Sequence, residues 1–279
     1  MDIRLRPAYD QCRQIAASHY ENFPVSSWLV PRGLRPHFHA VYAFCRISDD
    51  LGDEGEVGGR TEALSMWESD LKGALSGEAH GPVLAAVANT AAEFHITHDL
   101  FFNLLRAFKQ DQVKSEYASE QELLDYCRFS ANPVGRIVLH LIGAATPENA
   151  LDSDSICTGL QLANFAQDVA RDLANNRIYI PSDEMRDAGY TPSDLRSGIQ
   201  NAAFAAVMER QVSRARTFLQ LGLPLARRLP ARIGLEIRAI AHGGLRVLEL
   251  IERIGYGVLG RRPALGRKDY AVILARILR

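Results

Sequence analysis

The sequence has few cysteines and no long run without charge. Its four cysteines, Cys12, Cys45, Cys127 and Cys157, form no C-x-x-C pair, which argues against zinc sites and disulfide frameworks and favours reduced core thiols. The longest stretch without Asp, Glu, Lys or Arg covers residues 79–92, whereas a membrane-spanning helix needs about 20 mostly apolar residues. We therefore expect no transmembrane segment.

Signals for other compartments and ligands are also scarce. Residues 1–6 carry charges with no apolar core behind them, so no secretory signal is indicated and we expect the cytoplasm. No nucleic-acid-binding motif occurs, and we expect no nucleic-acid partner. Residues 255–260 match G-x-G-x-x-G, but they follow a helical pattern rather than a strand, which predicts a helix end instead of a dinucleotide site.

The 279 residues are 47% hydrophobic and 23% charged, as in ordinary globular proteins. Lys and Arg (32) nearly balance Asp and Glu (33), but residues 210–279 hold 15 basic and 4 acidic residues. A basic third suits an anionic ligand or a membrane surface, and arginine-rich solvated helix faces produce the same excess. Peripheral contact with the inner face of the membrane is one of these open interpretations.

Apolar residues recur at helical spacing almost everywhere, as around Phe44 and Leu248, and alternating strand patterns are nearly absent. No repeat or low-complexity tract divides the chain. We predict an all-α fold with one domain over residues 1–279 and, at most, two short extended pieces near residues 177–181. Thr146-Pro147 and Thr191-Pro192 predict helix starts, because each places a capping hydroxyl before a first-turn proline.

Two acidic clusters carry the strongest chemical signal. Asp49 and Asp53 are four residues apart, as are Asp168 and Asp172, so on helices the two carboxylates of each pair share one face. Each pair follows an apolar helical run, which predicts a position facing the core or a cavity. Like charges repel there, and a hard divalent cation with oxygen ligands would compensate them.

Magnesium typically binds through one or two carboxylates, waters and substrate phosphates, so the two pairs predict a cage for a Mg²⁺-bridged diphosphate. The alternative is a pair of solvated acidic helix ends, and the glycine-rich residues 52–59 do predict an early end of the first helix. A di-iron bundle needs Glu-x-x-His repeats and an EF-hand needs a longer acidic loop, and neither pattern is present. Further donors flank the pairs: Arg46, Gln161, Asn164, Arg171 and Arg177.

These residues resemble the squalene and phytoene synthase family. The resemblance implies an isoprenoid-synthase helical bundle around a central apolar cavity, with three Mg²⁺ per active site. It rests on Tyr42 to Arg46 with Asp49 to Asp53, Tyr126 to Gly135, Gln161 to Asp172, and Arg177 to Pro181. It implies that the catalytic Mg²⁺ ligands are Asp49, Asp53, Asp168 and Asp172, and that the substrate and its diphosphate contact Tyr42, Arg46, Gln161, Asn164, Arg171, Arg177, Tyr179 and Arg261.

Three departures from the farnesyl-coupling members of this family narrow the expected activity. Their serine block near the first helix is replaced by His19 to Phe23, and a further pocket tyrosine falls on Gly244. Phe129 stands where those members carry a tyrosine assigned to proton transfer in cyclopropane formation. Because phenylalanine cannot carry a proton, we expect an enzyme that ionises a diphosphate without making presqualene diphosphate.

Residues 20–25 and 132–135 look most like bacterial hydroxysqualene synthases. This resemblance implies a lyase that converts presqualene diphosphate to hydroxysqualene by diphosphate loss, cation rearrangement and water capture, in squalene and hopanoid biosynthesis. It implies no NADPH, and a functional partnership with a presqualene diphosphate synthase. Tyr20, Glu21 and Asn22 are the candidates to position the water, because they lie in the subfamily-specific block.

Two alternatives stay open. The same fold also suits head-to-head coupling of two prenyl diphosphates by a presqualene diphosphate, squalene or phytoene synthase. A non-catalytic helical partner that docks enzymes at the membrane is the other, and the four retained aspartates argue against it.

Overall fold

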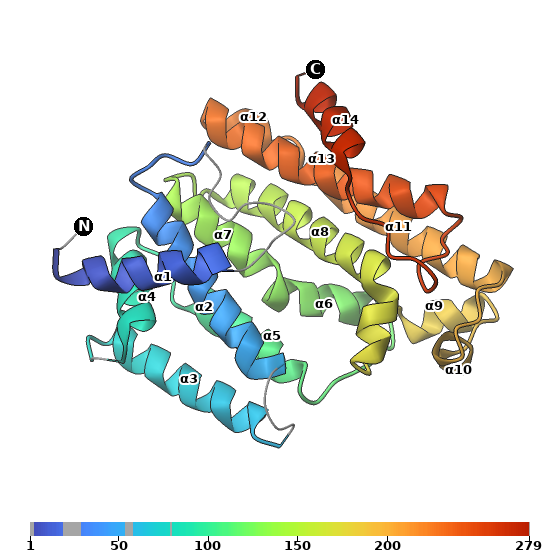
Figure 1. The fold of residues 1–279 in the computed structure, drawn as a ribbon, viewed down its shortest axis with the longest axis horizontal. Helices are drawn as coiled ribbons and strands as arrows, with labels where there is room; N and C mark the ends of the chain where they lie inside the picture. Colours follow the sequence, from blue (N-terminus) through green and yellow to red (C-terminus); the bar gives the residue numbers. More distant parts are fainter. Residues whose placement is uncertain (1–2, 19–28, 54–57, 79, 279) are drawn as a thin grey trace. The chain divides into compact units, whose positions relative to one another are not determined.

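The structure is a computed structural model. All the regular elements longer than a single bridge that it describes are helices (Figure 1). Those residues are 3–18, 29–53, 58–78 and 80–278. The predicted all-α fold class is confirmed. The expected extended pieces near residues 177–181 reduce to one isolated parallel bridge between Glu116 and Ile178. Two compact units divide the chain, and the single domain and its central cavity stay predictions.

The first unit comprises residues 1–113 and 133–150. Helix α2 contacts α1, α3, α4 and α5, and its fully buried Phe44 packs edge-on against Phe101, with ring centroids 5.4 Å apart. Large apolar side chains thus fix α2 from several sides. The elements are η1 (Ile3–Leu5), α1 (Arg6–Ser18), α2 (Arg35–Asp53), α3 (Arg60–Leu75), α4 (Pro82–Glu93), α5 (Asp99–Gln110) and nearly all of α7 (Asn132–Leu141).

A buried polar network ties α1, α2 and α4 together. The Tyr9 hydroxyl lies 3.0 Å from Thr90 Oγ1 and 3.2 Å from His37 Nδ1, and it accepts a hydrogen bond of 2.9 Å from Asn89. His37 Nδ1 also lies 2.9 Å from Thr90 Oγ1. Because partly satisfied polar groups are costly in a core, such a network favours one arrangement of the three helices.

The second unit comprises residues 114–132 and 151–279. Helix α13 contacts α11, α12 and α14 (Figure 1). The elements are α6 (Glu120–Ser130), most of α8 (Pro147–Ala174), α9 (Ser182–Asp187), α10 (Pro192–Arg196), α11 (Ala202–Gly222), α12 (Leu225–Arg228), α13 (Ala231–Arg253) and α14 (Arg267–Ile277).

Glycines bring α8, α11 and α13 into close contact. A Cβ on Gly159 would lie 2.8 Å from the backbone nitrogen of Leu219, and one on Gly222 would lie 2.6 Å from the carbonyl oxygen of Asp152. A Cβ on Gly244 would lie 2.9 Å from Leu160. At these glycines the three helices pack directly against side chains and backbone of their neighbours. This close packing limits the rotation of α8 and so holds its polar face in one orientation.

Both predicted helix starts are confirmed. Thr146 Oγ1 accepts a 3.2 Å hydrogen bond from the Asn149 backbone at the start of α8. Thr191 and Asp194 form a reciprocal capping box at α10, with hydrogen bonds of 3.1 and 2.9 Å. Among the helices that the structure describes, none combines the length and the apolar character needed to cross a membrane.

The four cysteines are free, as predicted. Cys12 and Cys127 are buried, and burial raises the pKa of each thiol to about 12. Thiols with such a pKa stay protonated and unreactive at neutral pH.

Candidate active site

Four predicted site residues lie along one face of α2. Tyr42, Arg46, Asp49 and Asp53 follow one another at helical spacing, with Asp53 as the last residue of the helix. The opposite face is held by Ser48, which is buried and accepts a 3.0 Å hydrogen bond from Trp67. Asp49 and Asp53 therefore stand on the last turns of a helix whose other side is fixed in the core.

Arg46 lies beside Asp49, one turn earlier on α2. Its Nη1 lies 3.5 Å from Asp49 Oδ2, and its Nη2 bonds Asp50, which raises the pKa of the guanidinium. Its Nε is buried and has no hydrogen-bond partner among the described residues. A buried donor without a partner beside these carboxylates suits an anionic oxygen, such as one of a diphosphate.

The first pair is more exposed than expected. The Asp49 side chain is 45% exposed, and Asp53 is also exposed, whereas a position facing the core or a cavity was predicted. The reason is its place at the end of α2, because Asp53 is the last residue of the helix.

The second set of predicted residues lies on α8. Gln161, Asn164, Asp168 and Asp172 share one face by helical spacing, and Arg171 lies at its edge, with Nη1 4.0 Å from Asp168. Asp168 is half-buried at 21% exposure. Both acid pairs are confirmed as pairs on continuous helices, which is the geometry that their spacing predicted.

The end of α8 directly follows Asp172. Asn176 takes the left-handed conformation at φ 58°, and the Arg177 amide bonds the Asp172 carbonyl at 2.8 Å. This pattern closes a helix and reverses the chain. Ile178 then donates a 2.7 Å backbone hydrogen bond to Ser115. Arg177 and Tyr179 are thereby held beside the second acid pair by local backbone geometry.

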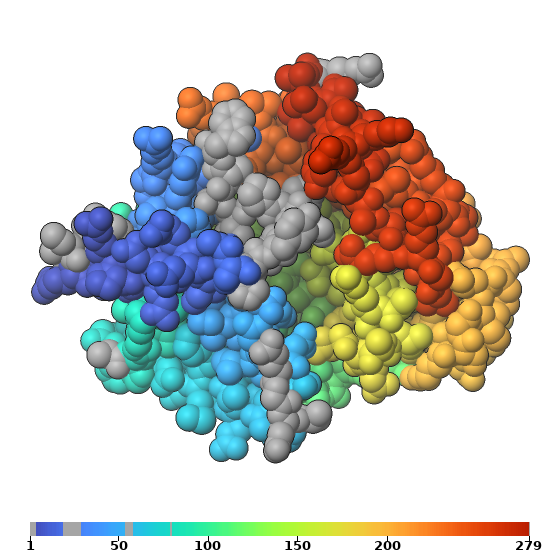
Figure 2. Space-filling model, viewed as in Figure 1, coloured from blue at the N-terminus to red at the C-terminus, as the bar shows by residue number. Residues whose placement is uncertain are grey.

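Asp168 is bound by an arginine that the sequence patterns did not predict. Arg262, in the loop after α13, contacts Asp168 through Nε and through Nη2 at 3.1 Å, and Nη2 lies 3.2 Å from Gln167 Oε1. Gln167 in turn donates to the Pro263 carbonyl. Figure 2 shows this loop, in red, against the yellow end of α8.

The predicted neighbour, Arg261, is exposed. The signal that would have pointed to Arg262 is the basic pair that follows Gly260 directly, but the sequence does not tell which of two adjacent arginines turns toward a distant helix. Hydrogen bonding to Asp168 raises the pKa of Arg262, so this guanidinium compensates the carboxylate charge.

Aromatic rings gather next to the second pair. Phe165 and Tyr179 stack with centroids 3.8 Å apart and an angle of 9° between their planes. Tyr126 lies 5.9 Å from Tyr179 and 6.2 Å from Phe165, and Tyr117 lies 5.7 Å from Tyr179. Tyr117, Tyr126 and Tyr179 are buried, so this cluster, of which only Tyr179 was predicted as a site residue, packs the segment after α8 against α8 and α6.

The donor set of both pairs fits magnesium. Carboxylate oxygens are its preferred protein ligands, and one or two of them suffice when phosphate and water complete the shell. Within the described part of the chain, no three His, Cys, Asp or Glu side chains form a metal-binding group, so each pair would rely on such additional ligands. Both pairs also stand near helix C-termini, where the helix dipole disfavours negative charge and a cation relieves it.

Two departures noted in the sequence have structural counterparts. Gly244 faces Leu160 and Leu219 so closely that a tyrosine there would displace them. Phe129 lies half-buried near the end of α6. The water-positioning candidates Tyr20, Glu21 and Asn22 lie outside the described residues.

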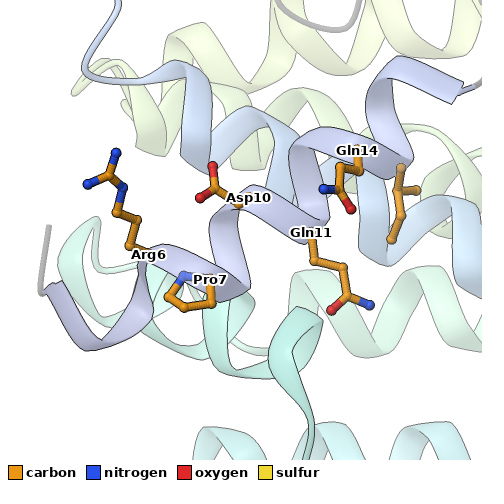
Figure 3. Close-up of a pocket in the computed structure, with 6 residues that line it drawn as sticks. Arg6, Pro7, Asp10, Gln11 and Gln14 are labelled. Atoms are coloured by element: carbon orange, nitrogen blue, oxygen red, sulfur yellow. The ribbon is translucent and has the colours of Figure 1, made fainter.

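A shallow groove along α1 contains none of the predicted residues (Figure 3). It is lined by Arg6, Pro7, Asp10, Gln11, Gln14 and Ile15. Its single carboxylate gives no basis for a metal or diphosphate site.

Comparison with known proteins decides the family. The family model described as squalene/phytoene synthase matches residues 16–269. The chain belongs to the squalene/phytoene synthase family. Among curated members of that family, hydroxysqualene synthase of Rhodopseudomonas palustris is 34% identical over 83% of this chain and 80% of its own. Phytoene synthase of Narcissus pseudonarcissus is 30% identical over 77% of this chain.

Solved structures agree with this membership. Squalene synthase HpnC from Alicyclobacillus acidocaldarius is 41% identical, with a TM-score of 0.88 over 92% of this chain and 97% of its own. A dehydrosqualene synthase has the same TM-score at 19% identity and shares the fold. This chain spans about half the length of the phytoene synthases of Narcissus pseudonarcissus and Zea mays, 53% and 54% of them.

Proposed function

We propose that this protein converts presqualene diphosphate to hydroxysqualene. The observation that carries the proposal is Phe129, a side chain without a transferable proton at the position of the family's proton-transferring tyrosine, together with both intact aspartate pairs. The names of two relatives support it, since the hydroxysqualene synthases of Rhodopseudomonas palustris and Zymomonas mobilis are each 34% identical to this chain.

The reaction begins with loss of diphosphate from the substrate. The carbon–oxygen bond breaks and its electron pair leaves with the diphosphate. Mg²⁺, three ions per active site in our proposal, would neutralise the charge that develops there, held by Asp49, Asp53, Asp168 and Asp172. Arg46, with its unpartnered Nε, donates to a diphosphate oxygen, and so do side chains of the α8 face and of the segments after α8 and α13: Gln161, Asn164, Arg171, Arg177 and Arg261.

A cyclopropylcarbinyl cation remains after the diphosphate leaves. An apolar pocket, with Tyr42 in its wall, would shield this cation from water while it rearranges. Water then adds its oxygen to the cation and loses a proton, which completes hydroxysqualene. No hydride enters, so NADPH is not consumed.

A product assay tests this proposal. Purified protein with Mg²⁺ receives presqualene diphosphate or farnesyl diphosphate, with and without NADPH, and mass spectrometry identifies the products. We expect hydroxysqualene to form from presqualene diphosphate, with or without NADPH, and farnesyl diphosphate to remain unchanged. A presqualene diphosphate synthase would supply this substrate by coupling two farnesyl diphosphates, in a route toward squalene and hopanoids.

The second candidate is head-to-head coupling of two prenyl diphosphates. It is favoured by the plant phytoene synthases, which are about as similar in sequence as the hydroxysqualene synthases. Consumption of farnesyl or geranylgeranyl diphosphate as the only substrate would replace the first proposal with this one. No Mg²⁺-dependent turnover of any prenyl diphosphate would point to a non-catalytic helical partner.

A further inference from the structure

The exposed face of α14 is apolar. Tyr270, Leu274 and Leu278 recur every four residues and are 46, 57 and 76% exposed. Ala271 and Ala275, which are also exposed, lie between them on the same side of the helix. A surface helix normally turns its polar side to water, but this stripe, Tyr270 to Leu278, exposes apolar side chains instead.

The opposite face of α14 is already used. Ile273 is buried, and Asp269 bonds Arg246 of α13 at 2.8 Å. The Arg276 carbonyl accepts a 3.3 Å hydrogen bond from Arg238. The helix is thus fixed on α13, and the stripe cannot be buried by rotating the helix within its own unit.

Positive charge accompanies the stripe. Arg267 and Lys268 are exposed in the first turn of α14, and Arg253 and Arg261 are exposed shortly before it. Cations in the first turn oppose the helix dipole, so helix stability does not account for Arg267 and Lys268. The acidic side chains of this region are engaged within the fold, with Glu249 bonded to Arg246 and Arg276 and Glu252 to Arg216.

We propose that the Tyr270–Leu278 stripe docks the protein on an anionic membrane surface. Leucines enter the boundary of the acyl chains, tyrosine suits the headgroup level, and the basic residues contact anionic lipids. The four exposed basic residues around the stripe, Arg253, Arg261, Arg267 and Lys268, favour such a surface over an uncharged apolar partner. The stripe lies beyond residue 269, where the family match ends, and α14 reaches the surface in Figure 2.

Flotation of the whole protein with vesicles tests this docking without any substrate, so its outcome is independent of the proposed reaction. We expect the protein to float with phosphatidylcholine vesicles that contain phosphatidylglycerol, and less at high salt. Leu274→Glu with Leu278→Glu should weaken binding roughly tenfold or more, because two apolar anchors are lost. Arg267→Gln with Lys268→Gln should weaken it roughly fivefold per charge, and only with anionic vesicles.

Leu151→Glu with Leu221→Glu is the matched control, because these leucines are 69 and 59% exposed in the same unit but outside the stripe. It should float like the unchanged protein. The proposal is overturned if the unchanged protein stays with the soluble fraction, or if the stripe and control variants float equally. Sedimentation velocity completes the test: a self-associated protein that Leu274→Glu with Leu278→Glu turns into monomers, without flotation, would assign the stripe to a second copy instead.

Discussion

Asp49 and Asp10 offer the same local chemistry in two places. Each is about half-exposed and lies near an arginine three residues away in sequence, at 3.5 Å from Arg46 and 3.4 Å from Arg13. Only Asp49 has a second carboxylate one turn further along its helix and a buried donor, Arg46 Nε, beside it. Variants of Asp49 and Asp10 can therefore separate a role in the site from the general effect of an acidic residue on a helix surface.

We therefore predict that Asp49→Asn lowers kcat by on the order of a hundredfold or more, because a ligand for the leaving group's counterions is lost. Its free energy of unfolding should change by less than about 0.5 kcal/mol, since the side chain is exposed. Asp10→Asn should leave both quantities unchanged. Steady-state kinetics and thermal unfolding measure them, and full activity of Asp49→Asn would contradict the role of the pair.

In the proposed site, Arg262 would compete with Mg²⁺ for Asp168, because it already contacts both carboxylate oxygens. We predict that Arg262→Gln binds Mg²⁺ about two- to fivefold more tightly in the absence of substrate, which corresponds to the loss of a half-exposed ion pair. Calorimetric titration of the metal measures it. Arg216→Gln, which breaks a similar pair with Glu252, is the control and should leave the affinity unchanged. Weaker Mg²⁺ binding by Arg262→Gln would mean that the arginine orients Asp168 rather than blocking it.

At this scale the sequence predicted the acid pairs but not their partners. Helical spacing alone is enough to align Asp168 with Asp172. The contact of Arg262 with Asp168 joins residues 94 apart, and the stack of Tyr179 on Phe165 depends on the reversal at Asn176. Such contacts follow from tertiary packing, which spacing does not encode.

Among the elements, α8 carries the second acid pair, and a glycine lets it approach α11 closely. A Cβ at Gly222 would lie 2.4 Å from Ile156 Cγ1 and 2.6 Å from the Asp152 carbonyl oxygen, and the latter is backbone that cannot move aside cheaply. Gly260 offers a contrast, since a Cβ there would lie 3.5 Å from its nearest neighbour, Gln200.

We predict that Gly222→Ala destabilises the protein by about 1–3 kcal/mol through overpacking, with Tm lower by about 2–4 °C for each kcal/mol. Gly260→Ala should leave Tm within about 1 °C. Differential scanning calorimetry compares the two. An unchanged Tm for Gly222→Ala would show that α8 and α11 separate easily.

The sequence predicted the ends of elements better than their contacts. The hydroxyl-proline pairs at Thr146 and Thr191 gave two helix starts, and Gly255 marked the end of α13, because caps are local chemistry. The glycines of α8, α11 and α13 carried no such local signal. Their role follows from which helices meet, and this depends on the whole chain.

Over the whole molecule, several histidines respond to pH in the same sense. Burial lowers the pKa values of His37, His39 and His242, for His37 against an opposing effect of Glu93. The folded state thus binds fewer protons than the unfolded chain, whose histidines titrate near pH 6.5. Their contribution to stability is present above that pH and is lost as the pH falls through the lowered folded values.

We predict that Tm falls by about 3 °C or more between pH 7.5 and 5.5, before most carboxylates titrate. His242→Gln should make this fall smaller, since it removes one of the three groups. Thermal unfolding at several pH values measures both effects. A Tm that rises toward pH 5.5 would mean that histidines with raised pKa values, such as His80 beside Glu78 and Asp70, dominate instead.

The loop between α13 and α14 links Asp168 on α8 to the Tyr270–Leu278 stripe. Arg262 bonds Asp168, and α14 begins at Arg267, five residues later. Five residues span at most about 17 Å, so a docked α14 would hold Asp168, in the proposed site, close to the lipid. A substrate with long apolar chains would then enter the site directly from the bilayer. Turnover should follow the mole fraction of substrate in the vesicle rather than its concentration in the bulk volume.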